Sequence, residues 1–175
     1  MSSDSLLQET LPKLQIPTVL LEAVMGGVTE GMSMAGVEPV PVGASRMLTV
    51  SKKYSILVSL MGEVSGNLTI NMSEHAACFF AGKMLCEEMT EVNEEVLDGI
   101  CEIGNLIAGS IKGLLEGSEY QISSISVPAL IVGANYSLYH YRGFTTASVE
   151  FEVNEIDVAH LQDRFMTVAL SLMKA

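Results

Sequence analysis

DGICEIGNLIAGSIKG, residues 98–113, reads as a helix with two chemically different sides. An α-helix turns by about 100° per residue. One side then collects apolar residues and a glycine: Ile100, Ile103, Gly104, Ile107, Ile111 and Leu114. The opposite side collects Asp98, Glu102, Asn105 and Gly109, followed by Lys112 and Glu116. We expect the apolar side to dock on a sheet and the polar row to face water or a partner.

The polar row contains residues that a helix does not need for stability. A solvated surface is the commoner explanation for a Glu and an Asn three residues apart. However, Asn is a poor helix former, and an exposed helical Gly costs about 1 kcal/mol relative to Ala. Gly109, one turn after Asn105, removes a side chain where another molecule's backbone could approach. Gly104 lies on the apolar side and is expected to permit tight packing of the helix on the sheet.

Length and charge limit the class of protein. The chain has 175 residues, 49% of them hydrophobic, and a formal net charge of −12. A chain of this length forms about one domain and can bury a sizeable core. The acidic surface repels phosphates of nucleic acids and anionic lipid headgroups. We therefore expect neither a nucleic acid nor a membrane as a partner.

The cysteines and histidines indicate no metal site. Cys78, Cys86 and Cys101 are odd in number and have no CxxC spacing, and the histidines have no HExxH or paired spacing. Cys101 lies on the same helix as the polar row but has no evident histidine base, so a thiol nucleophile is not expected. The first residues lack the pattern of a signal peptide, and no uninterrupted apolar run of 18 residues follows. We expect a cytoplasmic protein.

Apolar spacing, caps and turn residues predict the order of the elements. The first half is predicted to contain helix 16–34, an edge strand or an irregular entry into a sheet within 37–50, strands 55–61 and 67–72, and helix 74–89. The second half is predicted to contain a helix from 94 to near 117, strand signals in 122–133, a hairpin over 136–153 with its turn at 142–143, and a closing helix in the tail from 154. Ser73 and Asn93 are the expected N-caps of the two middle helices. This order predicts one α+β domain.

The chain also contains a weak internal similarity. LLEAVMGGVTEGM (20–32) can be aligned with ICEIGNLIAGSIKG (100–113), which places Glu22 opposite Glu102 and Met25 opposite Asn105. Short apolar helices often resemble each other by chance. The hypothesis is that the domain has two related halves and that the first half carries a decayed second site.

Three segments, in order, resemble the CheX/CheC chemotaxis phosphatases: GEVSGNLTINMSEHAACFFAGKML (62–85), EVNEEVLDGICEIGNLIAGSIKGLL (91–115) and SSISVPALIVG (123–133). That family carries a (Asp/Ser)xxxExxN signature on an exposed helix, here Asp98, Glu102 and Asn105, with a Gly or Asn four residues later, here Gly109. The resemblance runs from about Ile16 to Val153. The single copy of the signature is similar to CheX, since CheC types carry a second copy in the first helix.

The resemblance implies a CheC-like fold: a mostly antiparallel sheet of about six strands with long helices packed on it. It divides the chain into an N-terminal extension (1–15), a CheX-like domain (16–153) and a C-terminal helix (154–175) packed on the same domain. The segment after Val153 is longer than the family core leads us to expect. Family members also pair through their sheets, so the resemblance implies a homodimer.

The activity implied by the resemblance is hydrolysis of the aspartyl phosphate of a CheY-like response regulator. Asn105 would orient the attacking water, Glu102 would pair with the active-site Lys of the receiver, Asp98 would contact its rim, and Gly109 would admit its loop. The chain itself would bind no cofactor, and Mg²⁺ is expected in the receiver.

Two alternatives stay open at this point. The same helix could dock a receiver in a non-catalytic binding or scaffold protein of a two-component or flagellar switch complex. The chain could also be a purely structural acidic subunit of such a complex, with no preference for a phosphorylated partner.

Overall fold

The structure is a computed structural model that describes residues 15–138 and 142–174. In chain order the elements are α2 (Thr18–Ser33), β1 (Val40–Ser45), β2 (Tyr54–Gly62), β3 (Val64–Met72), α3 (Glu74–Leu85), α4 (Glu94–Leu114), β4 (Ile122–Ile125), β5 (Ala129–Val132), β6 (Thr145–Glu152), the 3-10 helix η1 (Val158–Asp163) and β7 (Phe165–Lys174). This confirms the predicted α+β class and the order of the first seven elements.

The described strands form one antiparallel sheet of seven strands, where about six were expected. The order is β1-β6-β7-β3-β2, and both β4 and β5 pair with β2 on its far side. The proline-containing strand β1 lies at the edge, as predicted, and its partner is β6. Residues 122–133 form the two short strands β4 and β5, with Pro128 between them.

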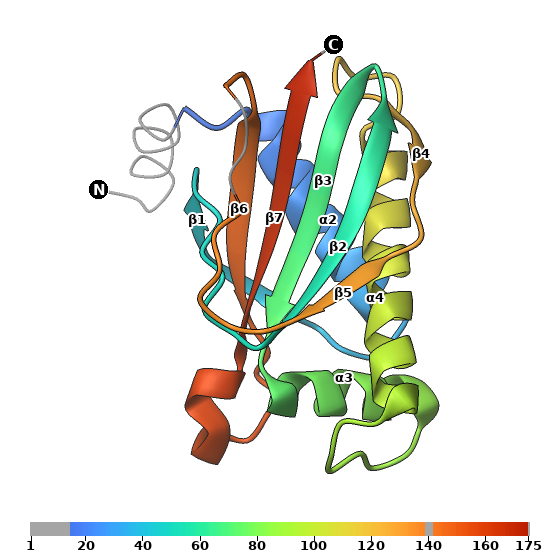
Figure 1. Cartoon of the computed structure of the whole chain (residues 1–175), viewed down its shortest axis with the longest axis vertical. Helices are drawn as coiled ribbons and strands as arrows, with labels where there is room; N and C mark the ends of the chain where they lie inside the picture. The colour runs from blue at the N-terminus through green and yellow to red at the C-terminus, as the bar shows by residue number, and fades with distance from the viewer. Residues whose placement is uncertain (1–14, 139–141, 175) are drawn as a thin grey trace, which may run out of the picture.

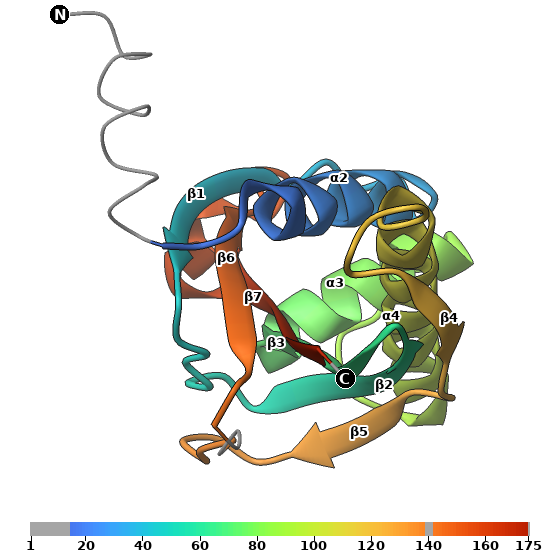
Figure 2. The same cartoon turned by 90° about the horizontal axis from the view of Figure 1, so that it is seen from above.

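Helices α2 and α4 lie side by side on one face of the sheet (Figures 1 and 2). Helix α2 packs over β6 and β7, whereas α4 packs over β2 and the short edge strands. Helix α3 lies across the end of the strands, against the first turns of α4. None of the helices in the described residues is long and apolar enough to cross a lipid bilayer.

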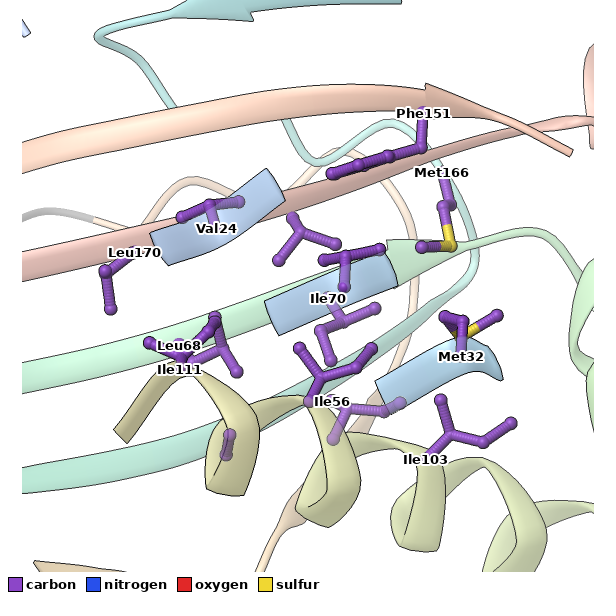
Figure 3. Close-up of a cluster of buried hydrophobic side chains, with 14 of the residues drawn as sticks. Val24, Met32, Ile56, Leu68, Ile70, Ile103, Ile111, Phe151, Met166 and Leu170 are labelled. Carbon is purple, nitrogen blue, oxygen red and sulfur yellow. The ribbon is translucent and has the colours of Figure 1, made fainter. Parts of the chain in front are cut away.

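The core fills the space between this helix pair and the sheet. Figure 3 shows side chains from both layers pointing toward one another. They come from α2 (Val24, Met32), β2 (Ile56), β3 (Leu68, Ile70), α4 (Ile103, Ile111), β6 (Phe151) and β7 (Met166, Leu170), and all are buried. Burial of large apolar side chains contributes roughly 1.5–3 kcal/mol each relative to exposure, so this layer stabilises the position of α4 on the sheet.

Glycines bring α2 and α4 into backbone contact. A Cβ atom on Gly31 would lie 2.8 Å from the Cα and N atoms of Ile107, and a Cβ on Gly27 would lie 2.3 Å from Cγ1 of Ile111. Gly27 meets Ile111 and Gly31 meets Ile107, so residue numbers rise along α2 where they fall along α4. The two helices are therefore antiparallel. Gly104 permits an equally close approach to the sheet, where a Cβ would lie 2.7 Å from Cγ2 of Ile56.

Both predicted helix caps are confirmed. The Ser73 Oγ accepts a hydrogen bond from the Ala76 N–H at 3.2 Å, and the Asn93 Oδ1 accepts one from the Val96 N–H at 2.9 Å. Each cap satisfies a backbone N–H that the first turn leaves without a partner. Helix α3 ends at Leu85 and not at 89, because Cys86 adopts a left-handed conformation with φ 56°.

The closing helix expected over 154–175 was wrong. Within the described residues this tail forms η1 and then β7, which lies inside the sheet between β6 and β3. Val158 and Leu161, which a helix would have buried, are 69% and 46% exposed. Met166, Val168, Leu170 and Leu172 instead alternate toward the helices, with small residues between them. This period of two is that of a buried strand.

The predicted hairpin over 136–153 is confirmed only in its second strand, β6, and in the turn at 142–143. The described residues 136–138 are not in a strand, and residues 139–141 lie outside the described residues.

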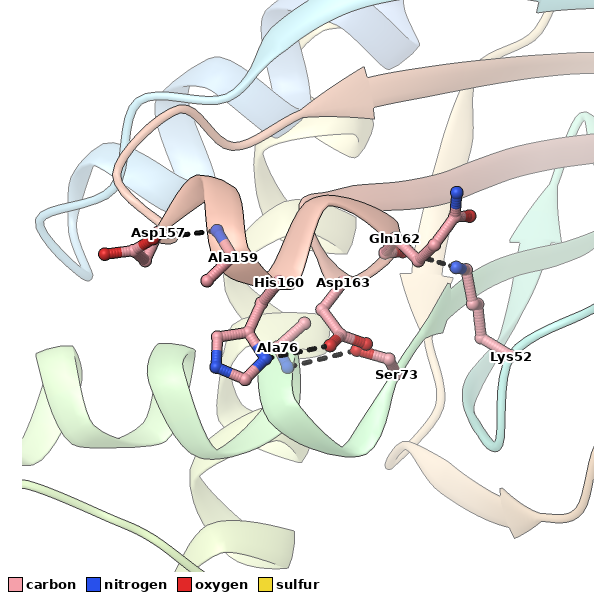
Figure 4. Close-up of polar contacts among 8 residues, drawn as sticks. All are labelled: Lys52, Ser73, Ala76, Asp157, Ala159, His160, Gln162 and Asp163. Atoms are coloured by element: carbon pink, nitrogen blue, oxygen red, sulfur yellow. Dashed lines mark hydrogen bonds and ion pairs between the residues drawn. The ribbon is translucent and has the colours of Figure 1, made fainter.

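Figure 4 shows polar contacts within η1 and between η1 and Lys52, which lies two residues before β2. The Asp157 Oδ1 accepts a hydrogen bond from the Ala159 N–H at 2.8 Å, and the Lys52 Nζ donates to the Gln162 carbonyl oxygen. The His160 ring stacks on the ring of His75 in α3, with 4.0 Å between the centroids. These contacts hold the start of β7 beside α3.

The contact between α2 and α4 can be tested by adding a methyl group. Gly31→Ala is expected to lower the free energy of unfolding by about 1–3 kcal/mol, because the new Cβ meets the backbone of Ile107, which cannot rotate away. Gly113→Ala is the matched control. Its Cβ meets no atom within 4 Å, so the better helix propensity of Ala should stabilise the protein by up to about 1 kcal/mol.

Urea unfolding followed by circular dichroism measures both changes. Equal stability of Gly31→Ala and the parent protein would contradict the close contact.

Candidate functional site

Helix α4 places the predicted site residues on its solvent side. Asp98, Glu102 and Gly109 are exposed, and Asn105 is half-buried. The cap at Asn93 sets where the helix begins, and the buried isoleucines on the other side set its rotation. The row predicted from the helical period is therefore present on a well-anchored helix.

Glu102 and Asn105 contact each other directly. The Asn105 Nδ2 donates a hydrogen bond to Glu102 Oε2 at 3.2 Å. Within the described part of the chain, the Asn105 Oδ1 accepts no hydrogen bond. The contact orients the carboxamide so that its oxygen is available to a group outside the protein.

A hollow of about 510 Å³ lies between α2 and α4, beside Asn105. We call it the α2–α4 hollow. Its lining residues are Glu30, Met34, Asn105, Leu106, Gly109, Ser110, Gly113 and Leu114. A second hollow on the other side of α4, of about 670 Å³, is lined by Gly109, Lys112, Gly113, Glu116, Gln121, Ile122, Ser123 and Ile125. Gly109 and Gly113 line both, so α4 presents bare backbone between two depressions.

Sequence reasoning missed part of this surface. Gly113 was available from the sequence, because Asn105, Gly109 and Gly113 follow one another at steps of four residues. Met34 could not be found in this way, since it reaches the hollow only through the packing of α2 on α4. Leu114 was assigned to the buried side of the helix but is half-exposed.

The matching position on α2 carries no amide. Glu22 is exposed, and Met25 is half-buried and packs against the hydrophobic core. A thioether is at most a weak hydrogen-bond acceptor. The idea of a decayed second site, and of two related halves, remains a hypothesis.

Cys101 lies next to Glu102, but its environment disfavours the reactive thiolate. Burial raises the pKa of the Cys101 thiol, and the nearby Asp98 carboxylate raises it further. Burial also raises the pKa of Cys78, whereas Cys86 is exposed. Because the thiolate is the nucleophile, Cys101 is poorly suited to attack phosphorus or carbon. No group of three or more His, Cys, Asp or Glu in the described residues could hold a metal ion.

A thiol-labelling experiment tests this environment. At neutral pH, a thiol reagent should modify Cys86 first and Cys101 much more slowly, because Cys101 is half-buried and its raised pKa leaves less of the thiol ionised. Asp98→Asn should speed the labelling of Cys101 modestly by removing one cause of its raised pKa. Glu116→Gln, just after the C-terminal end of the same helix, is the control. Peptide mapping by mass spectrometry gives the rates, and equal rates for Cys101 and Cys86 would contradict the assignment.

Two of three comparisons with known proteins found matches. The sequence model of one family, described as chemotaxis phosphatase CheX, matches residues 54–152, which is more than half of the chain and includes all of α4. No curated protein sequence matches.

Among solved structures, a CheC-like superfamily protein from Shewanella has a TM-score of 0.73 at 19% identity, and the match covers 90% of this chain and 99% of that one. Chemotaxis protein CheX from Vibrio vulnificus has a TM-score of 0.72 at 19% identity, with 88% and 97% covered. The CheX–CheY–BeF3–Mg²⁺ complex from Borrelia burgdorferi gives 0.68 at 23% identity, with 91% and 99% covered.

At these identities the structural matches establish a shared CheC-like fold. They cover 87–91% of this chain in the CheC-like and CheX matches, whereas the matched sequence segment is residues 54–152. The matched segment contains the whole polar row of α4, from Asp98 to Gly109. This chain belongs to the CheX family of chemotaxis phosphatases.

Proposed function

We propose that this protein hydrolyses the aspartyl phosphate of a CheY-like response regulator, with Asn105 as the residue that orients the attacking water. The observation that carries the proposal is the Asn105 carboxamide beside Glu102 on the solvent side of α4. Membership of a phosphatase family supports it, as does the crystallised complex of a related CheX with CheY.

The receiver supplies most of the chemistry in this proposal. An acyl phosphate is already activated, and Mg²⁺ and a Lys of the receiver neutralise charge on the phosphoryl group. Water attacks phosphorus, the bond between phosphorus and the carboxyl oxygen breaks, and the products are inorganic phosphate and the aspartate carboxylate. The phosphatase needs only to position the water, which requires no cofactor in this chain.

A carboxamide suits this task because it is neutral and has both a donor and an acceptor. The Asn105 Oδ1 accepts a hydrogen bond from the water. This contact directs a lone pair of the water oxygen at phosphorus, in line with the leaving oxygen. A carboxylate at the same place would be repelled by the phosphoryl oxygens. The anchored helix keeps the amide from moving once the receiver has docked.

Glu102 sets the depth of docking. Its exposed carboxylate pairs with the Lys of the receiver and gives up its contact with Asn105, which frees the Nδ2 group for the phosphoryl oxygens. Asp98, one turn back and also exposed, contacts the rim of the receiver. Gly109 leaves room for the backbone of the receiver beside the amide, since a Cβ there would meet nothing of this chain.

The expected homodimer is a further proposal. The strand β1 at one edge of the sheet and the short strands β4 and β5 at the other each leave backbone groups that a second copy could pair with. Light scattering in solution gives the molar mass and so tests whether the protein is a dimer. Because receivers of this type act in the cytoplasm, we also propose a cytoplasmic location.

Loss of the carboxamide should separate catalysis from binding. If positioning of the water contributes a hundredfold in rate, Asn105→Ala raises the barrier by about 2.7 kcal/mol. The affinity for the receiver should change little, because Asn105 acts mainly in the transition state. Dephosphorylation of the organism's own phosphorylated receivers, followed in single turnovers, measures the rate. A dephosphorylation rate equal to that of the parent protein would contradict the proposal.

Loss of the carboxylate should affect binding as well. Glu102→Gln is expected to weaken binding of the receiver by about tenfold and to lower the rate, because the Lys of the receiver loses its ionic partner. Glu150→Gln is the control and should bind normally, because Glu150 is exposed on β6 and its buried neighbours Val149 and Phe151 face the helices. Calorimetric titration with a receiver activated by beryllofluoride and Mg²⁺ measures the affinity. Equal affinities of the two variants would exclude the proposed role of Glu102.

The scaffold alternative gives a different pattern. A non-catalytic docking protein would bind the phosphorylated receiver without accelerating loss of phosphate. A purely structural subunit would bind phosphorylated and unphosphorylated receivers alike. The dephosphorylation rate, together with calorimetric titrations of the receiver with and without beryllofluoride, therefore distinguishes all three functions.

A further inference from the structure

We propose that the α2–α4 hollow is a second docking site for the phosphorylated receiver, which lays separate apolar side chains against Met34 and against Leu114 and places a cationic group near Glu30. This inference rests on the proposed function. It adds a contact that α4 alone does not provide, and it makes α2 part of the surface that selects the receiver.

The position of the hollow ties it to the reaction. Asn105 is one of its lining residues, so a partner that brings its phosphoryl group to the carboxamide must lie over the hollow. Gly31 faces Ile107, and the same antiparallel register continued by one turn brings Met34 to the end where Asn105 lies. Leu114 lies at the other end, where its Cδ1 would be 3.0 Å from a Cβ on Gly26.

The chemistry of the lining defines the occupant. Met34 is 61% exposed and Leu114 is 50% exposed, so both leave apolar surface in water. A flexible methionine can adapt to the shape of a partner. Glu30 is the one charged residue among those that line this hollow, and it is exposed. A segment with an apolar side chain at each end of the hollow and a Lys or Arg between them would therefore satisfy the site, whereas an acidic segment would be repelled.

The glycines of α4 allow the approach. Neither Gly109 nor Gly113 has an atom within 4 Å of the place where a Cβ would be, so the fold itself does not require a glycine at either position. Their bare backbone joins the α2–α4 hollow to the depression on the other side of α4. A receiver can thus lie across the helix and reach both Asn105 and Met34.

Two variants fill or charge the hollow without touching the proposed catalytic pair. Met34→Glu places a carboxylate against the apolar occupant, and Gly113→Leu fills the gap in the ridge of α4. Each should weaken binding of a receiver activated by beryllofluoride and Mg²⁺ by about tenfold, which is typical for loss of an interface anchor. With saturating phosphorylated receiver, each should hydrolyse at the rate of the parent protein.

Met47→Glu is the matched control. Met47 is 75% exposed, follows β1 and does not line the α2–α4 hollow. This variant should bind as the parent does. Thermal melts of all three variants confirm that each is folded before binding is measured.

The outcomes separate this inference from the proposed function. Weaker binding by Met34→Glu and Gly113→Leu, with Met47→Glu normal, supports the inference. Parent-like binding by both, while Asn105→Ala has lost activity, overturns the inference and leaves the proposed function intact. Full activity in Asn105→Ala overturns the proposed function, and the binding data still decide for or against the hollow.

Discussion

The close contact of α2 with α4 is the constraint on which the rest of the structure depends. Gly27 and Gly31 let the two helices touch at backbone distance, and this contact leaves Ile107 and Ile111 fully buried. A helix held on one side by another helix and underneath by a sheet can neither roll nor slide. The residues on its remaining side, Glu102 among them, are therefore presented outward in one fixed row.

This rigidity suits a reaction in which the partner brings the activated group. A carboxamide that only directs a water molecule accelerates the reaction by being held in one position. Its contribution therefore depends on the rigidity of the fold around it and not on a charge of its own. The surrounding surface follows a different rule. Gly109 and Gly113 weaken the helix slightly, and a Cβ at either position would meet no other part of the described structure within 4 Å. This is understandable if open backbone on this face serves an intermolecular contact.

The tail shows where a one-dimensional pattern is ambiguous. Val158, Leu161, Phe165, Val168 and Leu172 fit a helical period, but Met166 and Leu170 fill the gaps, and the run from 165 to 172 fits a strand equally well. Residues 168–172 of this central strand are buried on both faces of the sheet, so small residues on the second face blur the alternation. The tail forms a strand because the sheet has an open position between β6 and β3, which a strand fills and a helix cannot.

Local sequence by itself determined the helix with the polar row, its cap at Asn93 and the hairpin of β2 and β3. It also determined that Glu102 and Asn105 lie on the outward side of the helix. Helical period, caps and turns depend on neighbours along the chain, which is why the sequence is sufficient for them. Tertiary structure alone decided that the tail is a central strand and that Met34 lies in one hollow with Asn105. These depend on contacts between residues far apart in the chain, and such contacts are set by which surfaces remain to be covered when the elements pack.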